Sequence, residues 1–149
     1  MASTYSTSLK LELQATGENA GTWGTKTNTN LELVEQAVGG YEEVSIAGGA
    51  GTTALTMSDG AASNARNMVV KLTGTITGNR IVTVPDSIEK VYIVSNGTSG
   101  AHTVQFKTAS GTGYTFVAAD KSVRVLFADG TNVVDTGIIN TSSTDTLTN

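Results

Sequence analysis

Few side chains in this sequence could carry out acid, base or nucleophilic chemistry. The single histidine, His102, stands beside Thr103 at the edge of a predicted strand, and the chain has no cysteine. Metal sites and catalytic triads need several partners of this kind close together. The glycine-rich run at 48–51 lacks the Lys-Ser/Thr and the following helix of a phosphate-binding loop. We therefore expect no catalytic residue, no metal and no cofactor.

The carboxylates are also poorly spaced for catalysis. Glu42 and Glu43 form the only adjacent pair, and neighbours on a strand point to opposite faces of a sheet, which is unsuited to cooperative acid–base work. Asp129, Asn132 and Asp135 offer oxygen ligands of the kind that calcium prefers. A hairpin turn accounts for the first two without an ion, so we interpret them as turn residues.

Trp23 is the side chain that its own surroundings explain least. It is the only tryptophan, and it lies in a polar, glycine-flanked stretch with too few apolar neighbours for a local core. Tryptophan is favoured at interfaces because its ring buries a large apolar area while its N–H donates a hydrogen bond. Trp23 is predicted to bind another surface; packing against the β body of its own chain is the alternative.

Composition favours one β-rich domain with an N-terminal appendage. The 149 residues include 17 glycines, with 5% aromatic and 15% charged residues, which is typical of β-proteins with small polar side chains outside. The net charge is -4 and the Lys and Arg residues do not cluster, so the sequence lacks the basic patch that binds nucleic acid. No stretch approaches the roughly 18 apolar residues of a membrane span. We expect neither a nucleic-acid nor a membrane partner.

Residues 30–38 are the best helix candidate in the N-terminal segment 1–40. Thr29 and Glu32 have capping-box spacing, and Gly39 supplies a left-handed stop. One face is apolar, because Leu31, Val34 and Val38 recur at helical spacing, and Leu33 and Ala37 are expected to widen this apolar stripe. At about two and a half turns, this helix is too short to be stable by itself and must dock on something.

From Tyr41 onward, the hydrophobic period changes to two and turn signals recur at short intervals. The clearest hairpin has Asp129 and Gly130 at its turn. Short strands without a second helix favour a mainly β fold, with an antiparallel β-sandwich or jelly-roll-like body over 41–139. The expected strands are 42–47, 52–56, 68–72, 81–84, 91–95, 103–108, 115–117, 122–128 and 132–136, after a short one within 9–13. Residues 140–149 are predicted to be a linker.

The residues around Trp23 resemble an element found near the N-terminus of many tailed-phage fibre and other virion proteins. The stretch GENAGTWG at 17–24, followed by Asn28, Asn30 and a helix ending at Gly39, is similar to their GxxxGxWG…NxN pattern. The body resembles these proteins at 67–84 and 90–107. The end, 144–149, is similar to a linker that runs on into further fibre repeats.

The resemblance implies a homotrimeric tail-fibre base that docks on the virion, so that more distal parts serve viral attachment to the host cell. Its implied partners are further copies of the chain and virion proteins such as tail adaptor, nozzle or portal components. The chain would reside in the virion after assembly in the host cytoplasm. The implied docking residues are Gly21, Trp23, Gly24, Asn28 and Asn30. The implied oligomer contacts, around a trimer axis, are Leu31, Val34 and Val38.

Two other functions stay open at this level. A capsid decoration protein or head fibre would use the same β body on the shell. A carbohydrate-binding module is often a β-sandwich, but it usually needs exposed aromatic platforms, and aromatic residues are few here. A polysaccharide-degrading enzyme requires spaced carboxylates in a groove. We therefore predict a structural protein that is not an enzyme.

Overall fold

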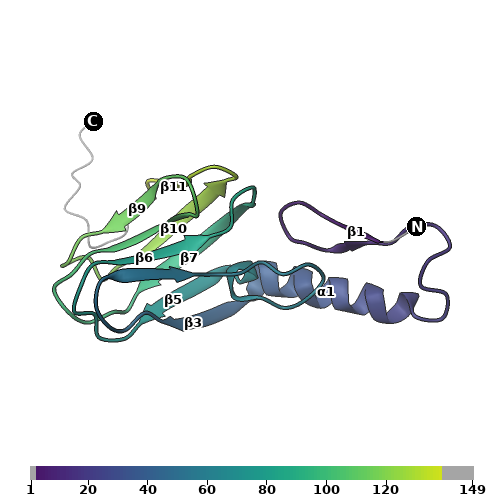
Figure 1. Ribbon diagram of the computed structural model, residues 1–149, viewed down its shortest axis with the longest axis horizontal. Coiled ribbons are helices and arrows are strands. Elements are labelled where there is room, and N and C mark those ends of the chain that lie inside the picture. Colours follow the sequence, from purple (N-terminus) through teal and green to yellow (C-terminus); the bar gives the residue numbers. More distant parts are fainter. Residues whose placement is uncertain (1–2, 139–149) are drawn as a thin grey trace.

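The computed structural model describes residues 3–138, in which a two-sheet β body carries a helix and a hairpin at one end (Figure 1). The predicted linker 140–149 lies outside the described residues. The helix α1 spans Trp23–Gly39, and a 3-10 turn, η1, spans Asn64–Arg66. The strands are β1 (Thr4–Tyr5), β2 (Glu12–Leu13), β3 (Tyr41–Ser45), β4 (Gly51–Ala54), β5 (Val69–Thr73), β6 (Arg80–Val84), β7 (Glu89–Asn96), β8 (Val104–Thr108), β9 (Gly113–Phe116), β10 (Val123–Asp129) and β11 (Val133–Asp135).

The predicted fold class is confirmed: residues 3–138 are mainly β, with a sandwich-like body, one helix and an N-terminal extension. Each strand predicted for the body is present, with its bounds shifted by no more than two residues. The hairpin at Asp129 and Gly130 is also present, because β10 and β11 pair antiparallel and Gly130 adopts a φ of 89°. Turn chemistry and period-two patterning therefore located the strands correctly.

The strand pairing is not purely antiparallel, as it was predicted to be. One sheet has the order β11-β10-β7-β5-β3 and the other β4-β6-β8-β9. Strands β3, β5 and β7 pair in parallel, and so do β4, β6 and β8. Antiparallel pairs join β7 to β10, β10 to β11 and β8 to β9. The chain thus alternates between the two sheets in three stacked coils before the antiparallel strands close the body.

A constant register holds the second and third coils together. Val69 pairs with Ile93 and Arg80 with Val104, and a bridge at the corner joins Thr75 to Ser99. One offset, 24 residues, therefore holds along the whole coil. Period-two patterning does not distinguish parallel from antiparallel neighbours, so the alternation along the strands did not reveal the coils.

The core lies between the two sheets. Inward-facing side chains alternate along each strand, and burial of each contributes about 1.5–3 kcal/mol. The rings of Tyr92 and Phe106 pack edge to face, with their centres 5.4 Å apart. The Tyr92 hydroxyl donates a hydrogen bond to the Ala65 carbonyl at 2.9 Å. The fully buried positions include Val70, Leu72, Val82, Tyr92, Val94, Val104, Phe106, Phe116 and Leu126.

The helix is longer than predicted, because it begins at Trp23 instead of residue 30. The predicted capping box at Thr29 and Glu32 therefore lies inside the helix and does not mark its start. The residue before the helix is Thr22, and its side chain makes no capping hydrogen bond. The strand predicted within 9–13 is shorter than expected, since only Glu12–Leu13 is extended and it pairs antiparallel with β1. These differences share a cause: hairpin and helix dock on each other, which local sequence does not reveal.

Candidate interaction surface

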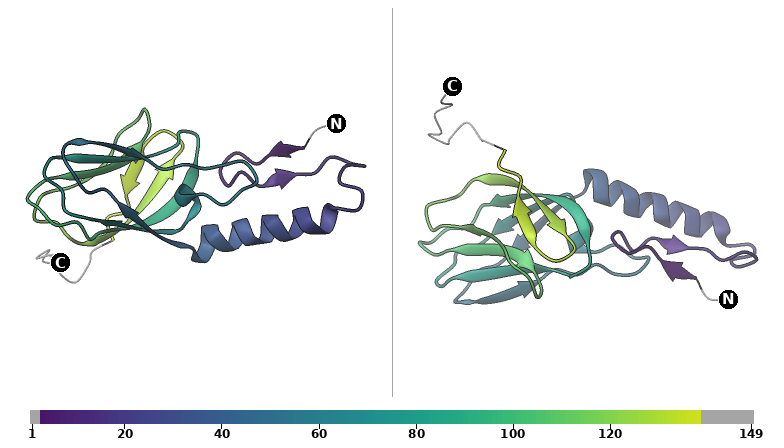
Figure 2. Two further views of the ribbon diagram at one scale, coloured as in Figure 1. Left: turned by 60° about the horizontal axis from the view of Figure 1, so that its bottom comes forward. Right: turned by 90° about the horizontal axis from the view of Figure 1, so that it is seen from above.

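The hairpin β1–β2 and the helix α1 form a stalk, residues 3–39, that projects from one end of the β body (Figure 1). Both views in Figure 2 show the hairpin beside the helix and the beginning of the helix far from the sheets. Trp23 is the first helical residue and therefore stands near the far end of the stalk. The fold thus presents this region away from the body.

Glu12 binds the hairpin to the helix through two hydrogen bonds with Asn30 and an ion pair with Lys26. Its N–H donates to Asn30 Oδ1 at 2.9 Å, and Asn30 Nδ2 donates to the Glu12 carbonyl at 2.8 Å. Its carboxylate lies 2.9 Å from Lys26 Nζ, one helical turn before Asn30. The hydrogen bond from Lys26 is the main cause that lowers the pKa of Glu12, and Glu12 in turn raises the pKa of Lys26. Hairpin and helix therefore form one unit.

Arg66 anchors the base of the stalk. The side chain is fully buried, and its Nε donates to the Leu9 carbonyl at 3.0 Å. Its Nη1 donates to Gln36 Oε1 at 3.2 Å and to the Ala61 carbonyl, and its Nη2 donates to the Ser58 carbonyl at 2.7 Å. Burial lowers the pKa of this guanidinium. A buried cation is tolerable only when its donors are satisfied, so Arg66 fixes hairpin, helix and adjoining loop together.

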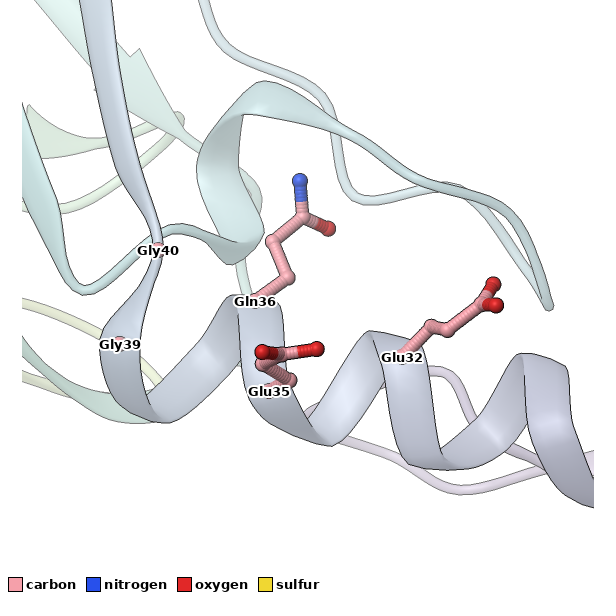
Figure 3. A pocket seen from close by; sticks show the side chains of 5 residues that line it. All are labelled: Glu32, Glu35, Gln36, Gly39 and Gly40. Carbon is pink, nitrogen blue, oxygen red and sulfur yellow. The ribbon is translucent and has the colours of Figure 1, made fainter.

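Where the helix meets the body, the surface has a shallow, open depression of about 360 Å³, lined by Glu32, Glu35, Gln36, Gly39 and Gly40 (Figure 3). The carboxylates of Glu32 and Glu35 do not point toward each other in Figure 3. A Cβ on Gly40 would lie 2.2 Å from the Gln36 carbonyl oxygen. The depression therefore lies at the tight exit of the helix into β3, and it lacks the apolar and aromatic side chains that line most ligand pockets.

The turn residues considered for calcium are engaged in hydrogen bonds. Asp129 Oδ1 accepts from the N–H groups of Thr131 and Asn132, and these backbone donors lower the pKa of Asp129. Asn132 Oδ1 accepts from the Thr112 N–H at 2.8 Å. Within residues 3–138, there is no group of three or more metal-ligating side chains. Asp129 and Asn132 stabilise the β10–β11 turn.

The structure divides the five predicted docking residues. Trp23 is 65% exposed, so the alternative interpretation, that it packs on its own β body, is wrong. Gly21 adopts a φ of 82° in the turn before the helix, Gly24 follows Trp23 in the first turn, and Asn28 is exposed. Asn30, in contrast, has both groups of its amide engaged with Glu12 inside the stalk. Gly21, Trp23 and Asn28 are therefore exposed on the stalk, whereas Asn30 has an internal structural role.

The three predicted oligomer contacts lie on the outer face of the helix. Leu31 and Val38 are 62% and 65% exposed and Val34 is 36% exposed, whereas Leu33 and Ala37 are buried on the inner face. Steps of three and four residues from 31 to 34 to 38 are the spacing of a coiled-coil seam. We call Leu31, Val34 and Val38 the helix stripe.

Sequence reasoning missed a second apolar surface, on the outer face of the five-stranded sheet. Its side chains alternate with the buried ones along each strand and so point away from the core. The alternation along each strand predicts only its core face, whereas the near-continuous apolar runs of β7 and β10 are the signal that their other face is apolar as well. This sheet patch has two rows across the strands: Tyr41, Val69, Ile93 and Val125, then Val91, Phe127 and Val134.

Comparison of the chain with protein-family models, with curated proteins and with solved structures gave no match. Among residues 3–138, no helix has the length and apolar character needed to cross a membrane. The surfaces available for a functional argument are therefore the Trp23 end of the stalk, the helix stripe and the sheet patch.

Proposed function

We propose that this chain is a structural protein of a tailed-phage virion, a tail-fibre base that docks on the tail or portal region through its stalk. The observation that supports this most is Trp23, which is 65% exposed at the far end of a projecting element. A large ring that is mostly exposed to water contributes little to the stability of the monomer, but tryptophan is among the side chains that contribute most to binding energy at interfaces. The resemblance of residues 17–30 to virion proteins supplies the kind of assembly.

The helix stripe supports self-association as part of this function. Leu31, Val34 and Val38 leave apolar area in water at coiled-coil spacing, and three copies around an axis would cover it. The Trp23 residues of such a homotrimer would stand together at one end of the bundle. That end would then enter a tail adaptor, nozzle or portal component.

Incorporation of variants into particles tests the docking. Phage are grown with Trp23→Ala, with Trp23→Phe or with the control Val117→Ala, which changes a 60% exposed side chain on the β body. An interface anchor of this kind contributes about 2 kcal/mol or more, so we expect Trp23→Ala to lower incorporation at least tenfold. Trp23→Phe should be intermediate and Val117→Ala unchanged.

Quantitative mass spectrometry of purified particles provides the readout. Incorporation of Trp23→Ala at the level of Val117→Ala would overturn docking through the stalk. Imaging of labelled particles then separates the two virion locations: label at the tail supports a fibre base, whereas label spread over the shell means a capsid decoration protein or head fibre.

A further inference from the structure

We propose that the sheet patch packs against a second copy of this chain. The inference rests on the proposed function, because it takes self-assembly as its starting point, and it extends the contact from the helix to the β body. Its basis is the outward row formed by Tyr41, Val69, Ile93 and Val125 together with the neighbouring row of Val91, Phe127 and Val134.

The patch has the make-up of an interface centre. Tyr41 is 54% exposed, Val91 43% and Phe127 37%, so these side chains still offer apolar area to a partner. On one side, the next row contains the ion pair between Glu43 Oε1 and Lys71 Nζ, at 2.7 Å. On the other side lie Glu89 and Asp129, which are register partners. An uncharged centre with charged residues at its rim is the usual anatomy of a protein interface.

The position of the patch points to another copy of the chain as its occupant. The helix ends at Gly39, and Tyr41, the first residue of β3, begins the first row of the patch, so the patch starts two residues after the end of the helix that carries the stripe. In the right view of Figure 2, the helix lies on the same side of the molecule as the five-stranded sheet. The hairpin covers the opposite face of the helix. Stripe and patch therefore face the same side, and an axis beside the helix would bring both into contact.

The area of the two surfaces supports the same occupant. A stable interface buries about 800 Å² on each partner, whereas the three side chains of the helix stripe expose on the order of 300 Å². The stripe alone is therefore too small to hold copies together at low concentration. The sheet patch adds seven side chains, four of which are at least 37% exposed, and so brings the contact closer to that requirement.

Sedimentation equilibrium of the full chain tests the inference. We compare Phe127→Lys and Val91→Lys with the control Val117→Lys, which places the same charge at a 60% exposed valine just after β9, a strand of the other sheet. Two patch variants guard against one that fails to fold, and circular dichroism checks each. The wild-type chain and the control should assemble with the same dissociation constant, and each patch variant should raise it at least tenfold.

A further variant, Leu31→Lys, separates this inference from the proposed function. If Leu31→Lys dissociates the assembly while both patch variants assemble like the control, the helix contact stands and the patch inference is overturned. A wild-type chain that stays monomeric at tens of micromolar also overturns it, whereas docking through Trp23 is tested independently on particles. Patch variants that keep their assembly but lose incorporation into particles would assign the patch to another virion protein, again against our inference.

Discussion

The protonation of Lys90 is changed strongly by folding. Its Nζ donates to the carbonyls of Asn67 and Val91, at 3.1 and 2.9 Å, and lies 3.9 Å from the centre of the Tyr92 ring. Burial lowers the pKa of Lys90 to about 8, and burial likewise raises the pKa of Tyr92. Carbonyls and a ring face stabilise the ammonium less than a carboxylate would, so the folded state favours the neutral amine as the pH rises.

These shifts predict the direction of the pH dependence of stability. Between about pH 8 and pH 10, the unfolded chain binds more protons at Lys90 than the folded chain, so the free energy of unfolding should rise with pH, by ~2 kcal/mol. Above about pH 10, Tyr92 should reverse the trend, because the unfolded tyrosine ionises first. Urea unfolding at a series of pH values measures this. Lys90→Met should abolish the rise; an equally steep rise in that variant would contradict the assignment.

Among the elements, the stalk shows most clearly what local sequence could and could not predict. The apolar stripe at 31, 34 and 38 was readable, and the structure places those side chains together on one exposed face. The first seven helical residues were not readable, because they lack an apolar period and include Gly24, Thr25, Thr27 and Thr29, which favour helix weakly. Within this stretch, Lys26 contacts the hairpin through its ion pair with Glu12 at 2.9 Å, a contact between residues 14 apart that local sequence does not reveal.

Asn30→Ala should loosen the hairpin without unfolding the body. The variant removes two hydrogen bonds to the Glu12 backbone and leaves that N–H without its partner, at a cost of about 1–2 kcal/mol. We expect hydrogen exchange of the Glu12 amide to accelerate by about tenfold, with strands of the body unaffected. Asn28→Ala is the matched control, since Asn28 is exposed on the same helix. Equal exchange in the two variants would contradict the role of Asn30.

Strand pairing gave the other difference between expectation and structure. Each strand of the body was found from its alternation and its flanking turns, but alternation is the same whether the neighbour is parallel or antiparallel. The register that pairs Val69 with Ile93 and Arg80 with Val104 arises from packing between coils far apart in sequence. The apolar runs of β7 and β10 indicate that both faces of these strands carry apolar side chains, but the rows across the sheet become visible only when the strand order is known.

For the whole molecule, three apolar surfaces share a simple arrangement. Trp23 stands near one end of the stalk, the helix stripe follows along it, and Tyr41 leads from the stripe into the sheet patch. The buried Arg66 and the tight exit at Gly40 hold stalk and body in a fixed relation. This arrangement suits a subunit that uses one side for its own copies and one end for a different partner.

A reconstruction of the whole virion at side-chain detail tests the central claim most directly. The account predicts that each Trp23 ring is buried in another virion protein at the tail or portal, and that the helix stripes and sheet patches of neighbouring copies face one another. A map in which the stalk stands free in solvent, while the body attaches to the particle through the four-stranded sheet, would contradict it.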